Sequence, residues 1–330
     1  MKNGLKIAFV YVGLVIGAGF ASGREILEYF NMRSREGLLP VALAFLMFFM
    51  ISYLILYKAR ELHISDFGEF VDAVSGRFSK IIKAVMYAFM FCGFFVMLSA
   101  GGALFETGVG CDGKFGIVLL ALVCFLVFSF DIKGIVMLNT VLVPFMIAGI
   151  TYLSVASLLY SSTPVSEFHN IKSSLVSVVC YVSYNTITAG AVLVPLYSIL
   201  DKRSIKVGAV VGSGVLCILI FVIRTALNAY YDRILYSEMP MLDLAVMRGE
   251  IYQIIYTLVL FTSICTTAVS HGFGILSRFH FNTTKSRVIA SAVFCLAALP
   301  FSDLNFSFLV SSLYSIFGYI GILWLVILVF

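Results

Sequence analysis

The chain has 330 residues, of which 61% are apolar and only 12% are charged, and its mean hydropathy is +1.06. Soluble domains are closer to half apolar and about a quarter charged, so this composition excludes a soluble enzyme or binding domain. The net charge of +5 arises largely in short connections between apolar runs, where membrane orientation explains it better than nucleic-acid binding does.

Ten apolar segments are long enough to be membrane-spanning helices. We expect them at residues 7–30, 38–57, 82–105, 115–130, 134–160, 175–200, 207–231, 252–276, 288–301 and 306–330. With ten spans, about two thirds of the 22 basic residues fall on the side that holds both termini. The sequence therefore predicts an all-α integral protein of the inner or plasma membrane, in contact with lipid and with both termini in the cytoplasm.

The first and sixth spans are each interrupted by small and polar residues. Gly17-Ala18-Gly19 interrupts the first, and Ser183-Tyr184-Asn185 is followed by Ala189-Gly190 in the sixth. A mid-membrane break frees backbone groups that hydrocarbon cannot satisfy, although small residues also allow close helix packing. We expect both helices to be broken and to form a solute site lined by Gly17, Ala18, Gly19, Phe20, Glu25, Tyr181, Ser183, Tyr184 and Asn185.

The two halves of the chain resemble each other. Aligning Gly19 with Gly190, an offset of 171 residues, also places residues 70–74 opposite residues 241–245. Because each half has five spans, an odd number, the second half must enter the membrane from the opposite side. We predict an inverted repeat of residues 1–160 and 161–330 within one transmembrane domain; chance similarity between apolar sequences is the alternative.

Glu25 follows the first interruption directly. An ionisable residue near a solute path is a candidate for function, whereas Arg24, Glu25 and Glu28 together could also mark the membrane interface. The chain has no zinc-ligand spacing, nucleophile elbow or phosphate loop. The sequence therefore predicts no catalytic residue and no organic cofactor.

The stretch from Ile16 to Glu25 resembles the first helix of YkvI-type bacterial membrane proteins, and the ten spans in two repeats resemble the LeuT-type fold of the amino acid, polyamine and organocation transporters. The resemblance implies secondary active transport by alternating access. We expect an amino acid or small amine as the solute, because a half-helix N-terminus attracts a carboxylate and Glu25 an ammonium. A non-transporting sensor or scaffold with the same fold is the alternative.

The resemblance also implies a sodium site. Sodium-coupled relatives use a spacing like that of Ser263, Thr266 and Thr267, together with first-helix carbonyls that align with Gly13 and Ile16. The alternative is that these hydroxyls bond back to their own helix. Na+ is the expected coupling ion; a proton is the rival, but the fifth span offers Asn139 and Thr140 and no basic residue within the membrane. Phe20 replaces a small polar residue common in those relatives, so no second sodium is expected.

Overall fold

A computed structural model describes residues 2–30, 38–129, 133–159, 174–276, 279, 281 and 283–329, and this part of the chain is helical without strands. Within it, eight helices are long and apolar enough to cross a membrane. They correspond to the second, third and fifth to tenth predicted spans. The first and fourth spans form shorter apolar helices, α1 (Lys2–Val15) and α7 (Gly113–Ser129).

The long helices lie close to the predicted spans. They are α4 (Leu39–Glu61), α6 (Ser79–Leu104), α8 (Lys133–Leu159), α9 (Ser174–Leu193), α10 (Lys202–Asn228), α13 (Glu250–Leu276), α14 (Thr284–Ala298) and α16 (Ser315–Val329). Short helices connect or extend them: α2 (Ala18–Ala21), α3 (Arg24–Tyr29), α5 (Phe67–Ser75), α11 (Tyr231–Ile234), α12 (Pro240–Arg248) and α15 (Phe306–Leu309). The fifth predicted span includes Asn139 and Thr140, whose side chains lie outside the described part of the structure.

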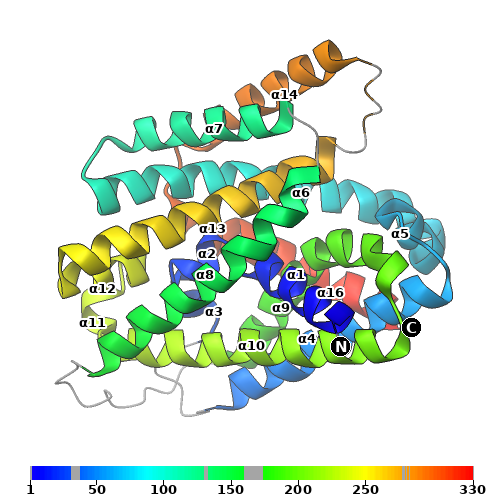
Figure 1. Ribbon diagram of the computed structural model, residues 1–330, viewed down its shortest axis with the longest axis horizontal. Coiled ribbons are helices and arrows are strands. Elements are labelled where there is room, and N and C mark those ends of the chain that lie inside the picture. Colours follow the sequence, from blue (N-terminus) through cyan, green and yellow to red (C-terminus); the bar gives the residue numbers. More distant parts are fainter. Residues whose placement is uncertain are drawn as a thin grey trace.

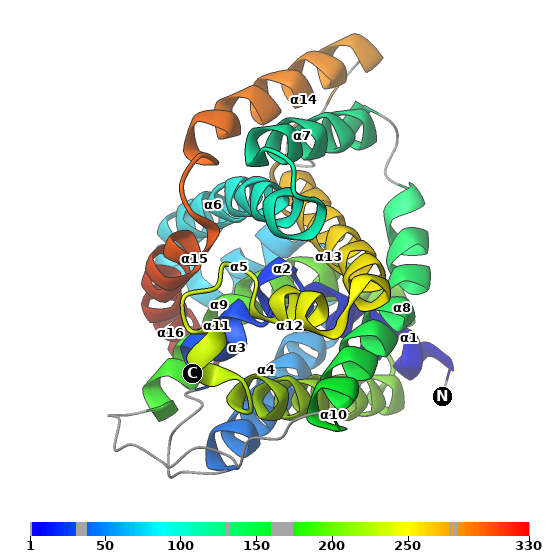
Figure 2. The same cartoon turned by 90° about the vertical axis from the view of Figure 1, so that its left-hand side faces the viewer.

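The long helices run between two ends of the molecule. Both chain ends and α5 lie at the right-hand end of Figure 1, and α11 and α12 lie at the left-hand end. Viewed from the left-hand end, α2 lies near the middle of a ring formed by α4, α6, α8, α10, α13 and α16, and α7 and α14 pack outside this ring (Figure 2). The broken first helix therefore lies at the centre of the bundle.

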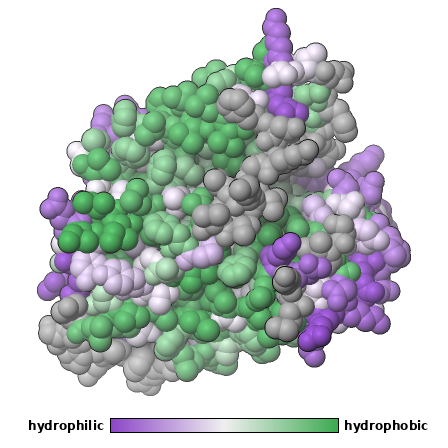
Figure 3. Space-filling model, viewed as in Figure 1, coloured by the Kyte–Doolittle hydropathy of each residue, from purple (hydrophilic) through white to green (hydrophobic). Residues whose placement is uncertain are grey.

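On the face shown in Figure 3, apolar side chains cover much of the middle, whereas hydrophilic side chains gather toward the ends. Large exposed side chains include Ile218, Leu296 and Leu323, each more than 60% exposed. Apolar surface on this scale is costly in water but is covered by lipid in a membrane. The chain is therefore a multi-pass membrane protein, as its composition predicts.

The break in the first helix is confirmed. Helix α1 ends at Val15, and the amide of Gly17 donates to Val15 O (2.8 Å) rather than to Gly13 O, its acceptor in a continuous helix. After the single turn of α2, Gly23 has φ = 79°, in the left-handed region that glycine adopts without strain. The chain then re-enters a helix as α3.

The predicted break in the sixth span is wrong. Helix α9 runs unbroken through Ser183–Gly190 to Leu193. Its polar side chains bond back to their own helix: Asn185 Nδ2 donates to Tyr181 O (2.9 Å) and Thr186 Oγ1 to Val182 O (2.6 Å), so they need no unwound backbone. The α-helix instead gives way to a 3-10 helix at Val194–Ile199, where Pro195 lacks the amide hydrogen that α-helix continuation needs.

The order of elements in the two halves follows the predicted offset. Helices α6 and α13 begin at Ser79 and Glu250, and α7 and α14 begin at Gly113 and Thr284, so each pair is separated by 171 residues. Helices α5 and α12 both have nine residues and lie at opposite ends of the molecule. The inverted relation of the two halves stays a prediction, and these correspondences are its support.

Candidate functional site

The carboxyl group of Glu25 lies against the backbone of Gly19. A Cβ atom on Gly19 would overlap Glu25 Oε1 and lie 2.6 Å from Glu25 Cδ, closer than real Cβ contacts allow. Glu25 is only 4% exposed, whereas its neighbours Arg24 and Glu28 pair with each other (3.4 Å) toward the surface. The side chain of Glu25 therefore turns inward, to the break, and the glycine provides the room for it.

Four tyrosine rings surround this carboxyl group, and we call them the tyrosine cage: Tyr29, Tyr181, Tyr184 and Tyr314. The rings touch one another, with centroids 5.6 Å apart for Tyr29 and Tyr181 and 5.0 Å apart for Tyr184 and Tyr314. Tyr181 and Tyr184 approach the carboxyl group itself, and the rings of Tyr29 and Tyr314 both pack against Tyr184. Helices α3 and α9 and the π-helical turn Val310–Tyr314 thus converge on one buried carboxyl group.

Several polar atoms in the tyrosine cage lack a partner. Glu25 Oε2 and the hydroxyls of Tyr181 and Tyr184 are buried, and none makes a hydrogen bond, although both hydroxyls approach the carboxyl group. A buried polar group without a partner costs about 1–3 kcal/mol, and more when charged. Three such atoms in one place require an explanation, and a bound water, ion or solute is one that would satisfy them.

The other predicted solute residues are placed differently. Ala18 and Phe20 are fully buried, and Gly17 faces Thr267 of α13. Ser183 points away from the tyrosine cage, because its Oγ lies 2.5 Å from Gly318 O of α16 and 2.8 Å from Cys180 O, two acceptors that share its single hydrogen. Asn185 bonds to its own helix, as described above. The tyrosine cage thus includes Tyr181 and Tyr184, whereas Ser183 contributes to helix packing.

Sequence reasoning missed three aromatic residues at this site. Tyr29 follows Glu25 by one helical turn, and residues at i and i+4 share a helix face, so its presence could have been inferred. Tyr314 and Phe89 carry no local signal, since they come from other helices; the Phe89 ring lies 6.0 Å from Tyr184 and 5.8 Å from His271 of α13.

Three residues of the predicted sodium site, Ile16, Ser263 and Thr267, lie at the break. Ser263 Oγ donates to Ile16 O (3.2 Å), and a Cβ atom on Gly17 would lie 3.2 Å from Thr267 Oγ1, which is buried without a partner. Thr266 differs, because its hydroxyl donates to Ser263 O of the same helix (3.0 Å). The carbonyl of Gly13 is released from the helix, as shown above. These neutral oxygens fit a hard monovalent cation.

A cavity of about 460 Å³ lies at the α5 end of the molecule. It is enclosed by α5, α6, the end of α9 and α13, and its lining includes Asp66, Asp72 and Lys83. Lys83 Nζ and Asp72 Oδ2 form an ion pair across it (2.5 Å). We call this cavity the α5 vestibule. Its lining residue Met90 is the chain neighbour of Phe89 in α6.

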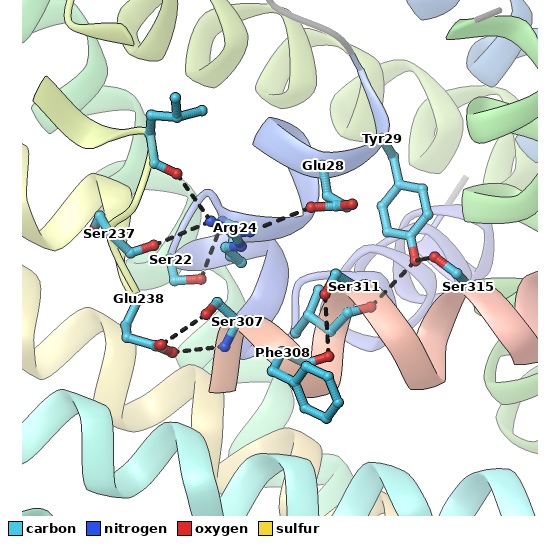
Figure 4. Close-up of polar contacts among 12 residues, drawn as sticks. Ser22, Arg24, Glu28, Tyr29, Ser237, Glu238, Ser307, Phe308, Ser311 and Ser315 are labelled. Carbon is cyan, nitrogen blue, oxygen red and sulfur yellow. Dashed lines mark hydrogen bonds and ion pairs between the residues drawn. The ribbon is translucent and has the colours of Figure 1, made fainter. Parts of the chain in front are cut away.

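The α12 end is closed over the break by hydrogen bonds. The amide of Met241 donates to Ser22 O (2.8 Å), and the hydroxyl of Tyr256 donates to Ala21 O (2.5 Å). In Figure 4, Arg24 reaches the segment before α12, where it donates to the carbonyls of Leu235 (3.4 Å) and Ser237 (3.3 Å).

The same segment is fastened to α15. Both carboxylate oxygens of Glu238 accept hydrogen bonds from Ser307, one from its amide (2.6 Å) and one from its hydroxyl (2.7 Å) (Figure 4). Residues 235–239, which we call the strap, thus join α3 to α15. Hydrogen bonds thus close the solute region on the strap side, and the α5 vestibule lies at the opposite end of the molecule.

This arrangement of helices is found in solved transporter structures. The chain superposes on the inward-facing conformation of Mhp1 with a TM-score of 0.70, at 14% identity over 96% of this chain and 72% of that one. MhsT in complex with L-phenylalanine gives 0.66, at 17% identity over 97% and 88%. A Na+-coupled sialic acid symporter gives 0.62, at 14% identity over 96% and 75%. The chain therefore has the LeuT-type fold of secondary transporters.

Sequence comparison gives nearer relatives. The chain is 28% identical to the uncharacterised membrane protein YkvI of Bacillus subtilis over 323 residues, covering 96% of this chain and 92% of YkvI. It is 26% identical to the uncharacterised protein YyaD of the same bacterium over 338 residues, covering 99% and 96%. No family model matches the chain. The resemblance to YkvI-type proteins is thus confirmed along nearly the whole chain.

Proposed function

We propose that this protein is a secondary active transporter that carries an amino acid or a small amine by alternating access, coupled to sodium. The observation that carries the proposal is the buried carboxyl group of Glu25, whose Oε2 atom lacks a partner and which faces the helix break beside the tyrosine cage. A structural role alone would leave these polar groups unsatisfied at a cost in stability. A bound solute with an ammonium group offsets that cost.

Alternating access requires one side of the site to open while the other closes. The α5 vestibule and the hydrogen-bonded strap side are the features expected of a state that faces the α5 end. With both termini in the cytoplasm, this state faces inward. Protease accessibility of tags at the two termini, in sealed right-side-out vesicles, tests that orientation: protection supports it and cleavage contradicts it.

Sodium coupling is supported by the oxygens gathered at Ile16, Gly17 and Thr267. Thr267 Oγ1 is a buried acceptor without a partner, and the break releases backbone carbonyls beside it. Within the described residues, no cluster of three His, Cys, Asp or Glu side chains could hold a metal ion. The expected ligands are neutral oxygens, which suit Na+.

The test uses the purified protein in proteoliposomes. Mass spectrometry of the purified sample identifies a co-purifying solute, and uptake of that solute is measured with a sodium gradient at constant pH and with a proton gradient in sodium-free buffer. Uptake driven by sodium supports the proposal. Uptake driven only by protons identifies the proton-coupled alternative, and solute binding without uptake identifies a sensor or scaffold.

A further inference from the structure

The position beside Gly19 that a solute carboxylate would use is already occupied. The carboxyl group of Glu25 lies on the Gly19 backbone so closely that no Cβ fits between them. A second carboxylate brought to this position must displace the Glu25 carboxyl group, and beside an ionised Glu25 it meets a like charge in a buried environment, which is strongly unfavourable. Helix α2 offers little compensation, since its four residues form a single turn with few aligned amide groups.

No cation near the tyrosine cage is free to receive a solute carboxylate within the described residues. Arg24 donates to the strap carbonyls and pairs with Glu28. Arg224 Nε donates to Phe30 O (3.1 Å). Glu25 itself has no ion-pair partner in this part of the chain. The site thus carries one carboxyl group and no positive charge.

The walls of the site also favour a cation. Aromatic ring faces attract ammonium groups, most strongly where water is excluded, and four tyrosine rings surround the Glu25 carboxyl. The hydroxyls of Tyr181 and Tyr184 and Glu25 Oε2 are acceptors without partners, and a protonated amine supplies donors to all three. A solute with one ammonium group and no carboxylate satisfies this set and leaves no charge unpaired.

We infer that the solute is an organic monocation, an amine without a carboxylate, held with its ammonium group between Glu25 and the tyrosine cage. This inference rests on the site of the proposed function and selects the amine over the amino acid. Glu25 supplies the carboxylate that an amino acid would otherwise bring to the site itself. The apolar remainder of the amine then faces buried aromatic side chains such as Phe89.

Two size-matched pairs of probes test the inference: 2-phenylethylamine with L-phenylalanine, and butylamine with L-norvaline. The members of a pair differ only in the carboxylate. We expect each amine to raise the thermal unfolding midpoint of the detergent-purified full-length protein, and at least one amine to bind roughly tenfold or more tightly than its amino acid. An amino acid that binds as tightly as its amine overturns the inference, as does the absence of stabilisation by either amine.

Variants assign the effect to the carboxylate. Glu25→Gln should abolish stabilisation by the amine, whereas Glu28→Gln, one turn further and at the surface, should keep it. If Glu25→Gln does not yield a monodisperse protein, Glu25→Asp retains the charge and should keep the preference for the amine over the amino acid. Amine binding that survives in Glu25→Gln, or a preference lost in Glu25→Asp, contradicts the inference.

Flux measurements separate this inference from the proposed function. Amine binding without amine counterflow in proteoliposomes contradicts transport. It does not contradict the inference that the ligand is an organic monocation. Sodium-driven uptake of the amino acid of a pair in preference to its amine supports transport and overturns the inference.

Discussion

The hydroxyl of Ser263 donates a hydrogen bond to the carbonyl oxygen of Ile16 (3.2 Å), which joins α13 to the break in the first helix. Thr267, one turn along α13, faces Gly17 on the same side of the break. Thr266 lies between them in sequence but bonds to its own helix. Adjacent threonines of one helix therefore have different surroundings, and this difference provides a matched test of the sodium site.

We expect Thr267→Val to raise the sodium concentration for half-maximal uptake by roughly tenfold or more, which corresponds to about 1.4 kcal/mol of lost ion binding. Valine keeps the shape of threonine but lacks the oxygen ligand. Thr266→Val is the control and should keep the sodium dependence of the parent, because its hydroxyl is already used within α13. Sodium titrations of uptake check this; an equal effect of the two variants would exclude Thr267 as an ion ligand.

Gly19→Ala should abolish solute binding while the protein stays folded. The added methyl group overlaps the Glu25 carboxyl, so the flexible side chain must leave the tyrosine cage. Gly214→Ala in α10 is the control, since a Cβ there meets nothing within 4 Å and alanine favours a helix by about 1 kcal/mol over glycine. Solute binding and thermal unfolding are measured together; unchanged solute binding in Gly19→Ala would show that the position of Glu25 is unimportant.

Ser183 and Tyr184 are neighbours in α9 with opposite expected effects. Ser183→Ala removes a hydrogen bond to Gly318 O and should lower stability by about 1 kcal/mol without a change in solute affinity. Tyr184→Phe removes a buried hydroxyl that has no protein partner, so it should weaken solute binding with little loss of stability. Thermal unfolding with and without solute separates the two effects. A loss of affinity in Ser183→Ala would place Ser183 in the solute site.

Glu238→Gln should loosen the strap. The substitution removes the charge from the acceptor of two hydrogen bonds from Ser307, and we expect a loss of about 1 kcal/mol. Hydrogen–deuterium exchange should become faster at Met241, whose amide donates to Ser22 O, and should stay unchanged in α5. Asp303→Asn, a nearby exposed carboxylate, is the control. Unaltered exchange at Met241 in Glu238→Gln would show that the strap does not hold the α12 side closed.

Much of the fold can be predicted from sequence because the signals are local. Hydropathy identifies the spans, since any segment that crosses hydrocarbon must be apolar and must satisfy its own backbone. Gly17-Ala18-Gly19 permits a break after Val15 but does not require one, since Gly101 and Gly102 lie within the continuous helix α6. The alignment of Ser263 and Thr267 with the first helix followed from a resemblance to relatives, and the contact of Ser263 with Ile16 agrees with it.

The features that sequence could not predict depend on how the helices pack against one another. The same polar residues could line a break in the sixth span or form hydrogen bonds to carbonyls of their own helix. In α9, the side chains of Asn185 and Thr186 form hydrogen bonds to their own helix. Ser183 and Tyr184 differ by one position, about 100° around the helix, so packing against α16 turns one to Gly318 and leaves the other beside Glu25. Sequence by itself determined a multi-pass bundle and indicated the first helix as a place where a break could occur. Only the tertiary structure decided that Tyr29, Tyr181, Tyr184 and Tyr314 enclose Glu25, because that cage is built from helices whose relative rotation is set by long-range packing.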